Sequence, residues 1–134
     1  MVESFPILQP GLNAEVKLIV GEKETAVHVG SGSLEVYATP ALVALMENAA
    51  VRTVEGYLSP GQTTVGGRID VRHIAATPVG MEVHVRAELV EVQGRKLTFH
   101  IKAWDIVELI GEANHFRYVI DKDEFMCRVG EKGK

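Results

Sequence analysis

Three polar residues of types that can hydrolyse an ester lie within mostly apolar stretches of this chain: Thr39, Glu47 and His73. A hydroxyl, a carboxylate and an imidazole together can supply nucleophilic attack and general acid–base catalysis. A glycine pair, Gly66-Gly67, precedes His73 in the same expected strand. Glycine permits the close approach of a ligand, and a free backbone amide there could polarise a carbonyl. These five residues form the candidate active site.

Each polar side chain also has a structural explanation. Thr39 stands before Pro40 at the start of an expected helix, where its hydroxyl could cap the first turn. Glu47, on the flank of the helix, could extend its carboxylate to solvent or pair with an arginine. His73 could be a core histidine bonded to a backbone carbonyl, because buried polar groups are usually satisfied structurally. Spacing alone favours these structural explanations one by one, and the three residues taken together strengthen the case for catalysis.

The element that must position Thr39 and Glu47 is a helix expected over residues 38–58, ATPALVALMENAAVRTVEGYL. From Ala41 to Val51 every residue except Glu47 and Asn48 is apolar, so the helix must be surrounded on most sides. A rotation of about 100° per residue defines its two faces. The deepest face is expected to hold Met46, Ala50, Val43 and Tyr57, and the solvent face Asn48, Arg52 and Glu55.

The remaining elements are expected to be strands, because apolar and polar residues alternate along them. One such strand places His73 on the same face as Val65, Gly67, Ile69 and Val71, toward the helix. A slip of the alternation at Val90 indicates a bulge. The expected strands cover residues 14–20, 25–29, 63–74, 81–89, 97–103 and 109–120. Strands grouped after one apolar helix predict an α+β fold in which an antiparallel sheet wraps the helix.

Composition narrows the class of protein. The 134 residues suit a single domain, 1–134, with an irregular lead-in at 1–12 and a polar tail at 127–134. The net charge is −4 and no Lys/Arg stripe occurs, so nucleic acid is not an expected partner. The first residues lack the pattern of a signal peptide, and charged residues interrupt the apolar helix, so no membrane association is expected. Cys127 is the only cysteine, which fits a reducing cytoplasm.

Motifs for cofactors and metals are missing from the sequence. Neither a phosphate-binding loop of the Walker kind nor a dinucleotide-binding glycine fingerprint occurs. The histidines are scattered at positions 28, 73, 84, 100 and 115, without the spacing of metal ligands. We therefore expect no cofactor and no metal.

Four segments resemble the hot-dog thioesterases, in particular the branch typified by fluoroacetyl-CoA thioesterase. They are VYATPALVALMENAA, TTVGGRIDVRHIAATPVGMEV, AELVEVQGRKLTFHIKAWD and IGEANHFRYVI, and the resemblance covers nearly all of residues 35–125. It implies a hot-dog fold, and a homodimer, or a dimer of dimers, with its active site near the subunit interface. It also implies hydrolysis of an acyl-CoA, with Thr39, Glu47 and His73 as catalytic residues and Gly66 holding the oxyanion. Glu47 or an activated water would attack, and Thr39 would orient Glu47 or that water.

One stretch departs from that branch. The fluoroacetyl-specific enzyme has aromatic residues where this chain has Gly30-Ser31-Gly32-Ser33. The sequence therefore predicts hydrolysis of several short acyl-CoA thioesters without a large preference for fluoroacetyl-CoA. A non-catalytic acyl-CoA binding or sensing module is the alternative, since a fold does not fix a function. A hydratase is disfavoured, because its Asn-Pro and neighbouring Asp and His do not occur.

Overall fold

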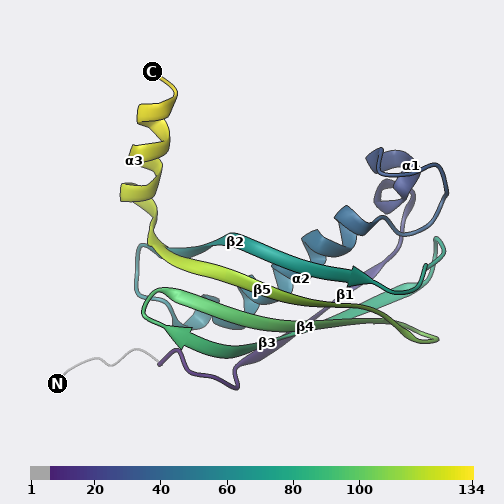
Figure 1. Cartoon of the computed structure of the whole chain (residues 1–134), viewed down its shortest axis with the longest axis horizontal. Helices are drawn as coiled ribbons and strands as arrows, with labels where there is room; N and C mark the ends of the chain where they lie inside the picture. Colours follow the sequence, from purple (N-terminus) through teal and green to yellow (C-terminus); the bar gives the residue numbers. More distant parts are fainter. Residues whose placement is uncertain (1–6) are drawn as a thin grey trace.

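The computed structural model describes residues 7–134, in which five antiparallel strands form one sheet that curves around a long helix (Figure 1). The strand order is β1-β3-β4-β5-β2. The expected α+β arrangement of one wrapped helix is therefore confirmed. The elements are β1 (Asn13–Ile19), η1 (Glu22–Glu24), α1 (Ala26–Val29), α2 (Thr39–Val54), η2 (Glu55–Tyr57), β2 (Gln62–His73), β3 (Glu82–Gln93), β4 (Lys96–Asp105), β5 (Leu109–Asp121) and α3 (Lys122–Lys132).

Helix α2 is the central helix, and its ends differ from the prediction. It begins at Thr39 with Ala38 as N-cap, and no side chain caps it, so the capping role expected for Thr39 is wrong. The threonine hydroxyl bonds His73 instead. The helix ends at Val54, and a tighter 3-10 turn follows in place of the last expected turn. The solvent side is exposed as predicted, at Asn48, Arg52 and Glu55.

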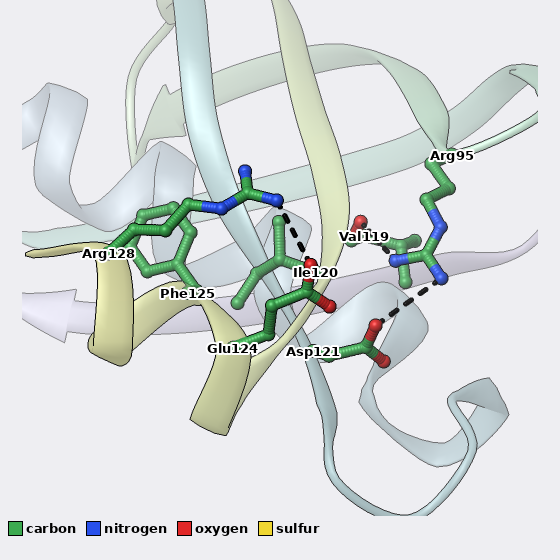
Figure 2. Close-up of a pocket in the computed structure, with 7 residues that line it drawn as sticks. All are labelled: Arg95, Val119, Ile120, Asp121, Glu124, Phe125 and Arg128. Atoms are coloured by element: carbon green, nitrogen blue, oxygen red, sulfur yellow. Dashed lines mark hydrogen bonds and ion pairs between the residues drawn. The ribbon is translucent and has the colours of Figure 1, made fainter.

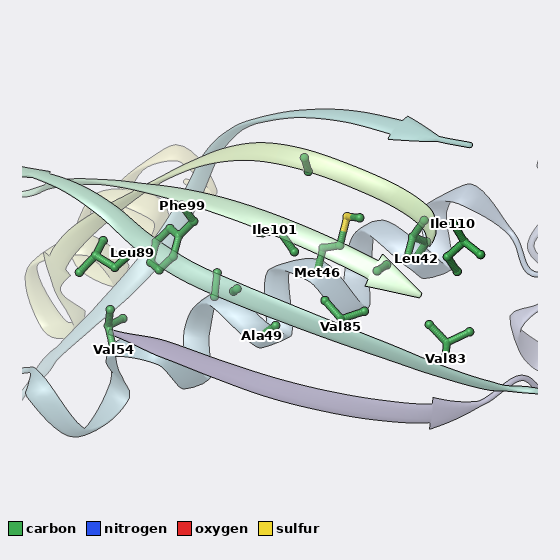
Figure 3. Close-up of a cluster of buried hydrophobic side chains, with 14 of the residues drawn as sticks. Leu42, Met46, Ala49, Val54, Val83, Val85, Leu89, Phe99, Ile101 and Ile110 are labelled. Atoms are coloured by element: carbon green, nitrogen blue, oxygen red, sulfur yellow. The ribbon is translucent and has the colours of Figure 1, made fainter. Parts of the chain in front are cut away.

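The core lies between α2 and the concave face of the sheet (Figure 3). Met46 and Ala50 are fully buried as expected, whereas Val43 and Tyr57 are only partly buried. Leu42 and Ala49 fill that face instead. The alternating residues of β3 and β4 pack against the helix with no exposed surface: Val83, Val85, Ala87, Leu89, Leu97, Phe99, Ile101 and Ala103.

Two bulges set the phase of the strands. The pairing of β3 with β4 shifts between Leu89 and Glu91, which confirms the bulge predicted at Val90. A second shift, between Gly66 and Arg68, leaves Gly67 without a partner on β5. The extra residue reverses the alternation.

The predicted phase of β2 is consequently wrong before the bulge and right after it. The Cα–Cβ direction of Gly66 points toward Glu47 on α2, so Gly66 rather than Val65 or Gly67 shares the helix-facing side. Beyond the bulge, Ile69 and Val71 pack on the core, and His73 is half-buried as expected.

Two segments are helical where the sequence predicts no helix. Residues 25–29 form no strand, because Thr25 caps a helical turn, α1, by accepting from the His28 amide at 3.3 Å. The polar C-terminal tail is helical, and α3 projects away from the sheet (Figure 1). Of the expected lead-in 1–12, residues 7–12 are irregular as predicted and residues 1–6 lie outside the described residues. No helix in the described part of the chain could cross a membrane.

Candidate active site

The first half of the site is a hydrogen-bonded pair that joins the start of α2 to the end of β2. The Thr39 hydroxyl lies 2.7 Å from His73 Nδ1. The Tyr37 ring stands edge-on to the imidazole, with ring centroids 6.5 Å apart, and its hydroxyl donates to the Ala41 carbonyl at 3.3 Å. The pair lines a pocket of about 270 Å³ with the small side chains of Ala26 and Ala75 among its walls.

The surroundings of the His73 imidazole favour its neutral form. Burial lowers its pKa, and the nearby backbone at Ala75 opposes that shift only in part. A neutral imidazole can accept a proton and return it, which is the requirement for a general acid–base. Its Nε2 atom is buried and has no hydrogen-bond partner within residues 7–134. Such an atom calls for an explanation, and a substrate or a second subunit would provide one.

The second half of the site surrounds Glu47, in the middle of α2. Its Oε2 lies 3.6 Å from Arg117 Nη1, and the two side chains are 41% and 7% exposed. A Cβ placed on Gly66 would stand 3.1 Å from the same Oε2, so a side chain at this position would crowd the carboxylate. Glu47, Gly66, Gly67 and His115 line a pocket of about 260 Å³ together with Arg68 and Ile69.

Arg117 is held by a dense set of hydrogen bonds. Its Nε donates to Thr64 Oγ1 at 2.9 Å, and Nη2 donates to the Thr64 carbonyl at 3.0 Å. Its Nη1 lies 3.1 Å from His115 Nε2. Burial lowers the pKa of Arg117, and the Glu47 carboxylate opposes the change by stabilising the cation. The guanidinium is thereby fixed beside Glu47.

Arg117 and His115 are site residues that the sequence interpretation missed. Both lie in the inward phase of β5, because Ala113 and Val119 of the same alternation are buried. The sequence analysis identified His73 because it is a polar residue at a position that shares one face with the apolar, inward-facing residues of its strand. The same test applied to β5 would have found both of these residues.

The structure brings the predicted residues together as two separate groups. Thr39 contacts His73, and Glu47 lies beside Gly66, but the groups line different pockets. Thr39 and Glu47 are eight residues apart on α2, which corresponds to about 12 Å along the helix axis. Within one chain, therefore, the Thr39–His73 pair and the Glu47 carboxylate face different pockets.

A further pocket, of about 220 Å³, lies between α3 and the end of β5 (Figure 2). Its two arginines already face carboxylates, with Arg95 3.5 Å from Asp121 and Arg128 3.0 Å from Glu124. Its charge is therefore locally balanced. None of the predicted site residues lines it.

A sequence model described as fluoroacetyl-CoA-specific thioesterase, FlK, matches residues 20–123. The chain belongs to the fluoroacetyl-CoA-specific thioesterase family. All five predicted site residues fall within the matched segment of this family.

Individual relatives agree with the family assignment. The fluoroacetyl-CoA thioesterase of Streptantibioticus cattleyicolor is 46% identical over 98 residues, which cover 73% of this chain and 70% of that protein. A variant of FlK solved in complex with acetyl-CoA is 37% identical, with a TM-score of 0.89 over 95% of this chain and 100% of the other. A thioesterase superfamily member of Thermus thermophilus is 25% identical, with a TM-score of 0.85 over 95% and 96% of the two chains. The hot-dog fold expected from the sequence is thus confirmed.

Proposed function

We propose that this protein hydrolyses short acyl-CoA thioesters to the free acid and CoA. The observation that carries the proposal is Glu47, a carboxylate held by Arg117 against the backbone of Gly66, in a chain of a thioesterase family. A carboxylate beside a bare backbone segment supplies a base or nucleophile next to a place where a carbonyl oxygen can lie.

Each proposed residue has a distinct part in the reaction. Glu47 takes a proton from a water that attacks the thioester carbonyl, or attacks the carbonyl itself to form an anhydride that water then hydrolyses to the free acid. The Gly66 amide stabilises the negative charge that develops on the carbonyl oxygen, and the adjacent bulge at Gly67 lets the substrate approach the strand. His73 takes a proton and delivers it to the departing thiolate, so that CoA leaves as a thiol. Thr39 orients the imidazole through the hydroxyl that lies 2.7 Å from Nδ1.

We propose that two copies of the chain complete each active site, the Thr39–His73 pair of one subunit facing Glu47 of the partner subunit. The separation of about 12 Å along α2 supports this arrangement. Strand β2 supports it further, because it ends the sheet order, and an open edge of 12 residues favours pairing with a second copy. Antiparallel pairing of two β2 strands about an axis between Ile69 and Asp70 would place His73 opposite Gly66 of the partner subunit.

The Gly30–Ser33 stretch supports the hydrolysis of several short acyl groups without strong selection among them. Ser31 lines the pocket beside Thr39 and His73. Gly30 has a φ of 84°, a conformation in which a residue with a side chain would be strained. Small side chains here leave the pocket without a bulky cover, so we expect acetyl-CoA and fluoroacetyl-CoA to be hydrolysed with comparable efficiency.

The alternative, a non-catalytic acyl-CoA binding or sensing module, is tested by the same experiment. Steady-state hydrolysis of a panel of acyl-CoAs, from acetyl to octanoyl, should give turnover that is highest for the short chains. Tight binding of acyl-CoA without turnover would favour the binding module. A reducing cytoplasm as the location remains a prediction, to which the exposed free thiol of Cys127 adds support.

A further inference from the structure

The buried imidazole of His115 has one hydrogen-bonding arrangement that satisfies both ring nitrogens. Its Nδ1 lies 2.7 Å from the Arg68 carbonyl, which can only accept, so Nδ1 must carry a proton. Its Nε2 lies 3.1 Å from Arg117 Nη1, which can only donate, so Nε2 must be an unprotonated acceptor. The ring is therefore neutral and held in the Nδ1–H form.

The surroundings of His115 reinforce the neutral form. Burial lowers its pKa, and the Arg117 charge lowers it further, while the Arg68 carbonyl and Glu47 oppose these effects. The charged groups that face the ring are Arg117 on its own strand and Glu47 on α2. Phe99 of β4 packs against it with ring centroids 6.2 Å apart, and the Arg68 side chain lies over the Phe116 ring instead.

We propose that His115 is a positioning residue for the thioesterase reaction, which aims Arg117 at Glu47 and ties both to the strand bulge that carries Gly66. This inference rests on the proposed function. The Nε2 contact fixes Nη1, the nitrogen that lies nearest to the Glu47 carboxylate. The Nδ1 contact fixes the backbone at Arg68, directly after the unpaired Gly67. The His115 ring thus fixes the position of the Glu47 base relative to the Gly66 backbone that binds the oxyanion.

Two substitutions separate the contacts of the ring. His115→Asn keeps an amide donor near the place of Nδ1 and loses the acceptor for Arg117. His115→Gln can place its carbonyl oxygen near the position of Nε2, which keeps the acceptor and loses the donor to Arg68. His100→Asn, on the outer face of β4, is the matched control and should leave kcat unchanged.

The expected kcat of the Asn variant is about tenfold to a hundredfold below wild type, the scale of a catalytic group displaced by about 1 Å. The Gln variant should retain at least about ten times the kcat of the Asn variant, with KM similar in both. Wild-type activity should fall on the acid side as His73 and His115 become charged, and the Gln variant should lose only the part of this fall that His115 contributes. Equal losses of kcat in the two variants, or effects confined to KM, would overturn the proposal.

Nitrogen-15 NMR of the wild-type histidine rings tests the assignment without any activity. The expected result at pH 7 is a neutral His115 ring with its proton on Nδ1. The His115 signals are assigned by their loss in the Asn variant. If neither variant folds, they are assigned by through-space contacts to Phe99. A proton on Nε2, or a charged ring, would overturn the proposal. A wild-type protein inert toward every thioester would contradict the proposed function, while the ring tautomer would still decide the assignment of His115.

Discussion

Replacing Glu47 with glutamine removes the carboxylate and keeps the size of the side chain. In the proposed reaction Glu47 is the group that activates the water or attacks the carbonyl. We therefore expect Glu47→Gln to lower kcat at least about a hundredfold, the scale associated with a lost general base.

The fold should tolerate this substitution, because the contacts of Glu47 are few and partly solvated. The side chain is 41% exposed and its ion pair with Arg117 spans 3.6 Å. Arg117 is buried, but the Glu47 end of the pair is solvated and the amide oxygen of glutamine can still accept from Arg117, so we expect a loss of about 1 kcal/mol. Arg117 keeps its bonds to Thr64 and His115 in the variant. For a chain of this length, a change of about 1 kcal/mol lowers Tm by about 3–5 °C.

The assay pairs steady-state hydrolysis of acetyl-CoA with calorimetric unfolding of the same preparations. Glu55→Gln is the control, since Glu55 is exposed just beyond the end of α2 and should change neither quantity. A Gln variant of Glu47 that keeps near-normal turnover would refute the catalytic role. A fall in Tm of more than about 10 °C would show instead that the structural contribution of Glu47 was underestimated.

Three further outcomes follow from the site. The pKa of His73 is lowered from its ordinary value of 6.5, so its imidazole stays neutral to below pH 6.5. The acid limb of kcat/KM should therefore lie below pH 6.5. A limb above that pH would contradict the assignment. Gly67→Ala would drive a methyl group into the Tyr118 ring. Overpacking of this kind costs about 1–3 kcal/mol. Chemical denaturation should show this loss in the free energy of unfolding, and combining Gly67→Ala with Tyr118→Ala should restore part of it. The ratio of kcat/KM for fluoroacetyl-CoA to that for acetyl-CoA should be far below about a thousandfold, because one substituent in an apolar pocket is worth about 1–3 kcal/mol; a larger ratio would mean that other residues rebuild a selective gate.

The sequence predicts the sheet and the central helix well, because alternation and an apolar run are local signals. The bulge at Val90 is visible as a phase slip, whereas the bulge at Gly67 is not, because two glycines have no side chains to show a phase. Residues 25–29 were expected to be a strand, and the local capping of α1 by Thr25 decides otherwise.

The candidate site is only partly predictable for a physical reason. The pairing of Thr39 with His73 requires the start of α2 and the end of β2 to meet, which only the fold determines. The capping role expected for Thr39 fails because its hydroxyl has a better partner in the imidazole. Arg117 and His115 occupy inward-facing positions of β5, which the alternation of apolar residues in the sequence already indicates.

The central claim is that a working active site takes His73 from one chain and Glu47 from the other. Mixing His73→Ala and Glu47→Gln subunits, after dissociation and reassembly, tests it most directly. Random reassembly would make half of the dimers mixed, each with one intact site, so activity should recover to about a quarter of the wild-type value from two nearly inactive parents. Light scattering of the wild type should give a dimer or a dimer of dimers. A mixture that stays as inactive as its parents, although mixed dimers form, would contradict the account.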